Sequence, residues 1–216
     1  MGSVQQPEEA ECSVAFGQHY AILQLDLMSV LIDAAQDVDE GQAFISSCVR
    51  WNDAVHRKVH RPPTIFTTLS FSNASQPELA PDADAPFTKL VREFGTFERG
   101  SPGVRIDSRF VVDEKDIVLE KTRWYAGAGN ALEQILKSQN IDTVVISGLT
   151  LSGVVTSTVY RLFDLDYRVY VIADNVLEMP AGQATDFKRV ILNTLFPKMN
   201  VHVISIEQAL LALERS

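Results

Sequence analysis

Short runs of aliphatic and β-branched residues recur along the chain, and segments with helical periodicity separate them. The runs have the length of buried strands, and the intervening segments are long enough to carry a helix. Parallel strands need such crossover connections, which are almost always right-handed and place helices over both faces of a sheet. We therefore predict an α/β fold, a three-layer doubly wound sheet of about six mainly parallel strands with helices on both faces. The expected strands cover residues 20–25, 64–69, 116–121, 143–148, 168–174 and 201–204.

Five segments between and after these strands have the apolar spacing of amphipathic helices. They cover residues 41–60, 130–138, about 152–164, 184–196 and 206–213. Residues 72–86 are rich in proline, serine and aspartate, which predicts a long surface loop. The chain has 216 residues and shows no internal repeat or linker, so it suits a single domain. We expect residues 1–18 to form an N-terminal tail and residues 19–216 to form that domain.

The charge balance excludes two classes of partner. The chain has 19 lysine and arginine residues against 28 aspartate and glutamate residues, a net charge of −9. Nucleic acids and anionic membranes require a basic surface, so we expect no nucleic-acid and no membrane partner. No apolar run approaches the roughly 18 residues that a membrane span needs. A small anionic substrate remains compatible with this charge, because one basic pocket can lie on an acidic protein.

Cysteine usage and the N-terminal residues bear on the compartment. The two cysteines, Cys12 and Cys48, form neither a disulfide framework nor a metal-binding spacing. The N-terminus has no basic segment followed by an apolar one, so it does not match a signal peptide. Both observations favour the reducing environment of the cytoplasm.

Three polar features follow expected strands, where open parallel sheets bind their ligands. They are Asp26, Lys121 and the turn that begins at Gly148. Each has an ordinary structural explanation, because an aspartate often caps a helix, a lysine is usually exposed, and a glycine permits a tight turn. Their joint occurrence at the same expected edge of the sheet predicts a functional site there.

These features belong to a longer pattern that resembles the isochorismatase-like hydrolase family of the cysteine hydrolase superfamily. The pattern consists of residues 25–28, 118–123 and 141–148 and of the strand 169–174 with its final aspartate. It extends over roughly residues 20–205 and is closest to isochorismatase-type members of fungal kind. The resemblance implies a doubly wound sheet and commonly an oligomer, so we expect a homo-oligomer. Some fungal and oomycete proteins that resemble this family are exported without a signal peptide, so secretion of that kind also fits.

Val154 stands six residues after Gly148, where the amidohydrolases of this family carry a nucleophilic cysteine. Valine has no lone pair and no ionisable proton, so it cannot form a covalent acyl intermediate. Ser152 lies two residues earlier and should point in a different direction on a helix. The metal-dependent amidases of the family need an Asp/His cluster after the second strand, and residues 66–76 contain neither residue type. We therefore expect no metal and no other cofactor.

Isochorismatases also lack the cysteine and hydrolyse a vinyl ether. The resemblance implies that isochorismate and water give pyruvate and 2,3-dihydro-2,3-dihydroxybenzoate, with Asp26 as the general acid. A nearby Lys121 lowers the pKa of an aspartate, whereas an apolar pocket and an anionic substrate raise it, and the mechanism needs the second effects to prevail. Lys121 would then bind the anionic substrate or position water.

We expect further substrate-binding residues around this pair. Arg123 suits a carboxylate because of its planar guanidinium. Backbone N–H groups from Leu149 and Thr150 to Val154 could bind a carboxylate at the start of a helix. A non-proline cis peptide, common in this turn of the family, would fall near Leu149-Thr150. Two further residues complete the set: Leu69, where isochorismatases tend to have glutamine, and Trp124.

Two other functions are compatible with the same residues. The chain could be a catalytically altered or inactive family member that binds a small anionic or aromatic ligand. It could also hydrolyse an unrelated amide or ester without a cysteine. Asp26-dependent release of pyruvate from isochorismate would distinguish isochorismatase activity from both of these alternatives.

Overall fold

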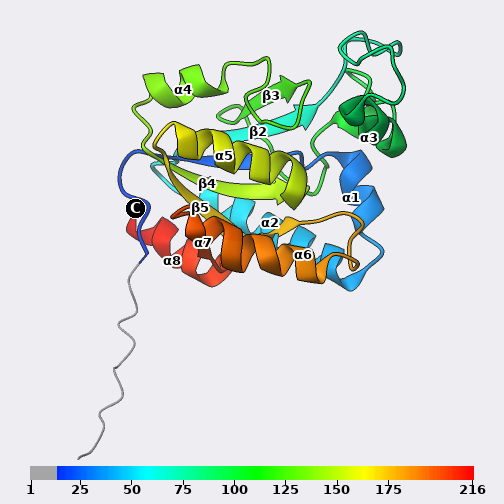
Figure 1. The fold of residues 1–216 in the computed structure, drawn as a ribbon. Helices are drawn as coiled ribbons and strands as arrows, with labels where there is room; N and C mark the ends of the chain where they lie inside the picture. Colours follow the sequence, from blue (N-terminus) through cyan, green and yellow to red (C-terminus); the bar gives the residue numbers. More distant parts are fainter. Residues whose placement is uncertain (1–13) are drawn as a thin grey trace, which may run out of the picture.

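A computed structural model describes residues 14–216, so most of the expected tail and Cys12 lie outside the described residues. Six strands form one sheet in the order β3-β2-β1-β4-β5-β6, and every neighbouring pair is parallel (Figure 1). The predicted doubly wound α/β fold is therefore confirmed. The strands are β1 (Tyr20–Leu25), β2 (Thr64–Leu69), β3 (Ile117–Lys121), β4 (Thr143–Leu149), β5 (Arg168–Leu177) and β6 (His202–Ile204).

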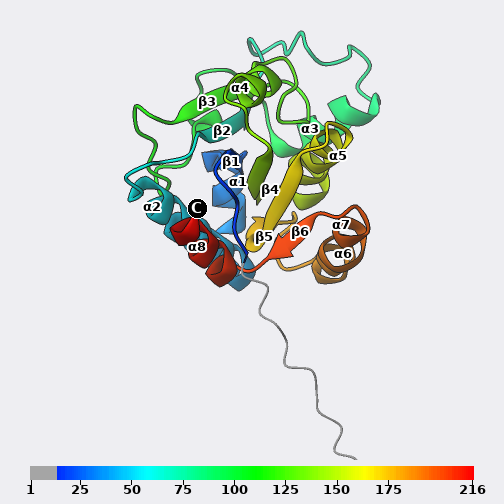
Figure 2. The same cartoon turned by 90° about the vertical axis from the view of Figure 1, so that its left-hand side faces the viewer.

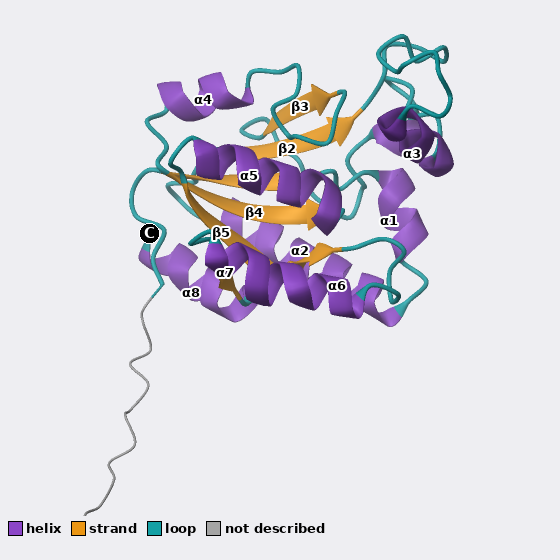
Figure 3. Ribbon diagram, in the orientation of Figure 1, coloured by secondary structure: helices purple, strands orange, loops and turns teal. Residues whose placement is uncertain are grey.

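Helices cover both faces of the sheet, which gives the three layers visible in Figures 2 and 3. One face packs against α2 and α8, and the other packs against α4, α5 and the segment from α6 to α7. The helices are α1 (Ser29–Ala35), α2 (Asp39–His56), α3 (Pro86–Phe94), α4 (Leu132–Ser138), α5 (Thr156–Asp164), α6 (Thr185–Val190), α7 (Phe196–Lys198) and α8 (Ile206–Arg215).

All six residues of β1 and all seven of β4 are buried, because successive side chains of a central strand enter opposite helical layers. A third apolar cluster lies at the carboxyl ends of the strands, where α1 and α3 pack against Leu69, Leu149 and Leu177. This cluster forms the floor and walls around the edge at which the sequence places the site.

The structure adds helical segments that the sequence did not predict. Helices α1 and α3 and a 3-10 turn at Pro102–Val104 were not expected. The expected helix 152–164 begins with a π-helical turn, Leu151–Val155, and a second π-helical turn, Ile191–Leu195, separates α6 from α7. Strand β5 continues to Leu177, three residues beyond its expected end. Within residues 14–216 no helix combines the length and the apolarity that crossing a bilayer requires.

Two local features fix the ends of the central strands. Phe16 falls inside the expected tail, yet its side chain is fully buried beside Tyr20, Trp51 and Tyr170. Burial of a phenylalanine stabilises the fold by roughly 1.5–3 kcal/mol, so the packed domain already includes this residue. At the other end of β1, Gly148 has φ +143°, and a Cβ there would lie 2.2 Å from the carbonyl oxygen of Leu25. Only glycine permits this approach of β4 to β1.

Candidate functional site

A cavity of about 210 Å³ lies beyond the carboxyl ends of β1, β2, β4 and β5. Most of the residues that the sequence placed in the site line this cavity: Asp26, Leu69, Trp124, Leu149, Thr150 and Val154. The remaining lining residues come from α1 and its N-terminal flank, from α3 and the loop after it, from the π-helical turn and from the segment after β5: Met28, Leu31, Leu90, Val91, Phe94, Phe97, Ser152, Glu178 and Met179. The side chains of the described lining residues are therefore apolar apart from two carboxyl groups, two hydroxyl groups and the indole N–H of Trp124.

Asp26 and Lys121 meet directly beneath this cavity. The Nζ atom of Lys121 lies 2.7 Å from Oδ2 of Asp26, and the hydroxyl of Thr67 donates to Oδ1 at 2.8 Å. The lysine ammonium also donates to the carbonyl oxygen of Arg123 at 3.0 Å. These residues come from the ends of β1, β2 and β3, which are neighbours in the sheet. The parallel register thus brings together two residues that are 95 positions apart in the sequence (121 − 26).

Burial dominates the electrostatics of this pair. The Lys121 side chain has no exposed surface and the Asp26 side chain is 6% exposed. Burial raises the pKa of Asp26, while the Lys121 charge and the hydrogen bonds from Lys121 and Thr67 oppose that rise without cancelling it. The backbone of Asp26 has φ +55°, a left-handed conformation that is uncommon outside glycine and clusters at functional sites. Burial and the left-handed backbone therefore both single out Asp26 as a candidate functional residue.

The residue that the sequence resemblance places at the position of the cysteine, Val154, is apolar and belongs to the cavity lining. Val154 lies in the π-helical turn Leu151–Val155, is 1% exposed and contributes to the cavity lining. The peptide bond Leu149-Thr150 is cis, as expected for this turn. A Cβ on Gly153 would lie 3.2 Å from the Trp124 ring and 2.6 Å from the hydroxyl oxygen of Thr150. The glycine therefore lets the indole ring pack closely against the helix start.

Replacing Val154 with cysteine is expected to add one thiol that small alkylating reagents reach through the cavity. Cysteine reactivity follows exposure and thiolate content. The Val154→Cys thiol should therefore react with iodoacetamide at least about tenfold faster than the thiol of Val159→Cys, a fully buried position of α5 in the core. Mass spectrometry of the labelled proteins measures both rates. Equal rates would contradict the placement of Val154 in the cavity wall.

Arg123 does not reach the cavity. Its guanidinium donates to the backbone carbonyl oxygens of Thr122 and Glu78, and it lies 5.0 Å from the centre of the Phe87 ring. The side chain is exposed and is absent from the cavity lining. Trp124, the next residue, does line the cavity and is 38% exposed, so it forms part of the cavity mouth. A second anion contact at Arg123 has no support in this arrangement.

Two polar residues of the site were not found from the sequence. Thr67 lies two residues before the end of β2, so strand alternation places it on the same side as Leu69, and this signal could have identified it. Glu178 follows the unexpected extension of β5, and with the strand ended at residue 174 it would have fallen in a loop. Its side chain lines the cavity and accepts a hydrogen bond from the backbone N–H of Ser152 at 2.6 Å.

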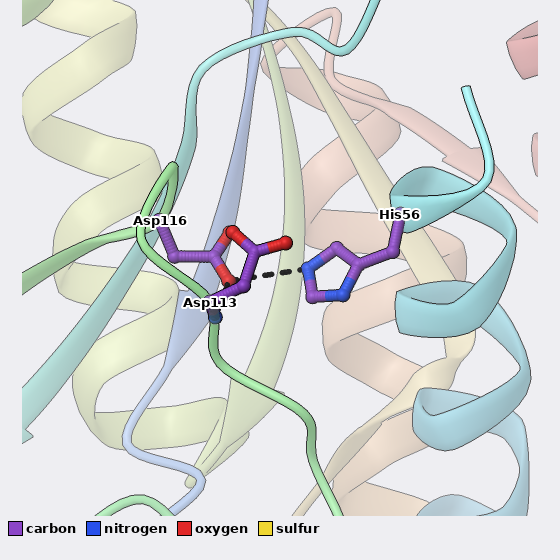
Figure 4. A group of neighbouring side chains, drawn as sticks. All are labelled: His56, Asp113 and Asp116. Carbon is purple, nitrogen blue, oxygen red and sulfur yellow. Dashed lines mark hydrogen bonds and ion pairs between the residues drawn. The ribbon is translucent and has the colours of Figure 1, made fainter. Parts of the chain in front are cut away.

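A second cluster of titratable groups lies at the opposite edge of the sheet, just before β2 and β3. His56, Asp113 and Asp116 have ligand atoms within 4.8 Å of one another (Figure 4). The guanidinium of Arg61, however, donates to both oxygens of Asp113 at 2.7 and 2.9 Å and to Asp116 at 2.5 Å. Arg61 also holds the pKa of Asp113 well below its usual range. Because a cation here would face this guanidinium, we interpret the cluster as an ion-pair network and not as a metal centre.

Comparison with known proteins identifies relatives of this chain. The chain is 27% identical over 171 residues to an N-carbamoylsarcosine amidase of Arthrobacter sp., an alignment that covers 78% of the chain and 63% of that protein. The chain thus spans less than two thirds of the length of this curated relative. An isochorismatase-like hydrolase from Alkaliphilus metalliredigens has a similar fold, with a TM-score of 0.72 and 20% identity over 90% of this chain and 99% of that one.

An isochorismatase family protein from Burkholderia thailandensis superposes with a TM-score of 0.67 and 22% identity, covering 93% of this chain and 98% of that one. At these identities the two solved structures support the fold alone. The model of the isochorismatase domain matches residues 20–208, which is most of the chain and agrees with the extent of the sequence resemblance. The protein therefore belongs to the isochorismatase family of hydrolases.

Proposed function

We propose that this protein hydrolyses a vinyl ether without a covalent intermediate, with Asp26 as the general acid. The observation that carries the proposal is the buried Asp26 carboxyl, whose raised pKa and position in the cavity suit proton donation. Val154 fills the place of the cysteine on which acyl transfer would depend, so acid-driven chemistry fits the cavity better than amide hydrolysis.

The reaction balances with Asp26 as its proton carrier. The carboxyl group gives its proton to the terminal methylene carbon, and the ether oxygen donates electrons to form an oxocarbenium ion. Water adds to the cationic carbon and returns one proton to the Asp26 carboxylate. The hemiketal then loses its alcohol, since the carbon–oxygen bond to the alcohol breaks while the hydroxyl proton moves to the leaving oxygen. Lys121, 2.7 Å away, stabilises the Asp26 carboxylate between these steps.

Isochorismate is the first substrate to test, because the family resemblance implies it. Its two carboxylates find little support in the lining, which includes Asp26 and Glu178 but neither lysine nor arginine nor histidine among the described residues. The proposal is therefore the vinyl-ether reaction at this site, and isochorismate is one substrate on which it is tested. The amidase activities named for related proteins are less suited to a cavity with valine at this position.

The test uses isochorismate and its uncharged dimethyl ester in D₂O. Protonation of the methylene carbon predicts that the released pyruvate, or methyl pyruvate, carries one deuterium in its methyl group, which NMR detects. Mass spectrometry of the protein during turnover should show no acyl adduct. Release of neither product from either compound would overturn the proposal.

One observation favours a second candidate, a member that binds its ligand without turnover. Both oxygens of the Asp26 carboxyl accept hydrogen bonds, one from Thr67 and one from Lys121, so one of these contacts must break before the group can carry a proton to a substrate. Saturable binding of a vinyl ether without release of a ketone would support this candidate.

A further inference from the structure

We infer that Glu178 makes the cavity selective for small apolar molecules that are uncharged or carry one positive charge. The ligands in question are those of the cavity to which we assign vinyl-ether hydrolysis. The inference rests on that proposal only in taking this cavity as the reaction site. A carboxylate of the chain itself lies at the start of a helical segment, a place that would otherwise attract an anion.

Glu178 is held firmly in that position. The residue follows the last residue of β5 and is 8% exposed, and its side chain lines the cavity. One carboxylate oxygen, Oε2, accepts from the backbone N–H of Ser152 at 2.6 Å, and the other accepts from the N–H of Met179 at 3.0 Å. Two backbone donors therefore fix the orientation of this carboxylate.

The first of these donors belongs to the start of a long helical segment. The π-helical turn Leu151–Val155 continues directly into α5, so the N–H of Ser152 is among the first donors of the segment. Such groups have no partner within the helix and carry a partial positive charge, which makes them a ready site for a carboxylate or phosphate. In this protein the carboxylate already belongs to the chain, so a substrate carboxylate would have to displace Glu178 or lie beside it.

No described residue of the lining carries a cationic side chain. Among the lining residues the ionisable side chains are Asp26 and Glu178, which are both acids. The nearest buried cation, Lys121, has no exposed surface and is engaged by Asp26. A like charge that is brought into a partly desolvated cavity is repelled, so a carboxylate ligand is disfavoured. An ammonium group or a hydroxyl donor facing Glu178 does not meet this penalty.

The apolar side chains of the lining indicate the size and shape of the ligand. Aromatic side chains of Trp124, Phe94 and Phe97 and the thioether of Met179 surround the cavity. These groups suit a single small ring, because aromatic and thioether contacts accept flat apolar surfaces. The cavity therefore fits one apolar ring with a donor group directed toward Glu178.

Binding of three isosteric probes tests this inference without any turnover. Benzylamine, benzyl alcohol and benzoate share one ring and differ in charge, and calorimetry or ligand-observed NMR gives their dissociation constants. The wild-type protein should bind benzylamine and benzyl alcohol at least about tenfold more tightly than benzoate. In Glu178→Gln the preference for benzylamine over benzoate should fall by about tenfold or more, because the like charge is gone.

Glu93→Gln serves as the matched control, since Glu93 is an exposed glutamate of α3 outside the lining. This variant should keep the wild-type order of affinities. The inference is overturned if benzoate binds the wild-type protein as tightly as benzyl alcohol, if none of the three probes binds it, or if Glu178→Gln folds and keeps the wild-type ratio. The wild-type order needs no variant, so it decides the matter even if Glu178→Gln does not fold. Failure of the proposed hydrolysis leaves these affinities unchanged, so the two outcomes are read separately.

Discussion

Replacing Asp26 with asparagine is expected to lower turnover of a vinyl ether by about 10²–10⁴-fold, the usual contribution of a general acid. Asparagine keeps the shape of the side chain and an oxygen that can accept from Thr67, but it has no carboxyl proton to donate. The rate constant at saturating substrate measures the loss. Asp37→Asn, at an exposed position after α1, is the matched control and should retain full activity.

The pH dependence of turnover by the wild-type protein tests the same mechanism independently. Burial raises the pKa of Asp26, so the protonated form that donates persists above the ordinary range of a carboxyl group. Activity should therefore be retained at low pH and decline as the pH rises through this raised pKa. A rate that increases over that range, or an Asp26→Asn variant with wild-type turnover, would exclude Asp26 as the acid.

Replacing Lys121 with methionine is expected to lower the free energy of unfolding by about 3–5 kcal/mol at neutral pH. The substitution removes the ammonium that lies 2.7 Å from Asp26 and leaves a buried carboxylate with only Thr67 as a side-chain partner. Urea unfolding measures the loss. Lys137→Met, at an exposed position of α4, should unfold with nearly wild-type stability. Adding Asp26→Asn to Lys121→Met should recover about half of the loss or more, because no buried charge then remains.

The stability of Lys121→Met should also depend on pH in a defined direction. Because burial raises the pKa of Asp26 in the folded state above its unfolded value, the folded protein holds the proton to higher pH. Stability is therefore greatest below the unfolded pKa and is lost as the pH rises through the folded one. Loss of Lys121 removes an effect that lowers this pKa, so the variant should show the larger decline between acidic and neutral pH. An equal decline in the variant and in the wild-type protein would contradict the pairing of these two groups.

The central part of the fold could be read from the sequence because it depends on local patterns. A strand buried on both faces is a continuous apolar run, and residues 64–69 match the observed β2 without any shift. The meeting of Asp26 and Lys121 followed from the same logic, since both residues end strands of one parallel sheet. Short helices such as α1, with seven residues, give too few turns for a clear periodicity.

The ends of elements decided which site residues were missed. With β5 expected to end at residue 174, the position of Glu178 relative to the sheet could not be predicted. The strand in fact continues to Leu177, directly before Glu178. The register between β4 and β5 shifts between Ile146 and Gly148, and no sequence pattern announces such an irregularity. Arg123 shows the opposite limit. Arg123 follows Lys121 in the motif as expected. Its guanidinium, however, donates to the backbone carbonyl oxygens of Thr122 and Glu78 and does not reach the cavity.

The two tryptophans of this chain lie in very different surroundings, and this gives the protein an internal optical probe. Trp51 is fully buried in the core on one face of the sheet, whereas Trp124 is 38% exposed at the mouth of the cavity. A ligand that enters the cavity displaces water from the Trp124 indole and leaves Trp51 unchanged. Its arrival should therefore shift only the red part of the intrinsic fluorescence, and Trp124→Phe should abolish that shift. Ligands of this cavity can be found by spectroscopy before their chemistry is known.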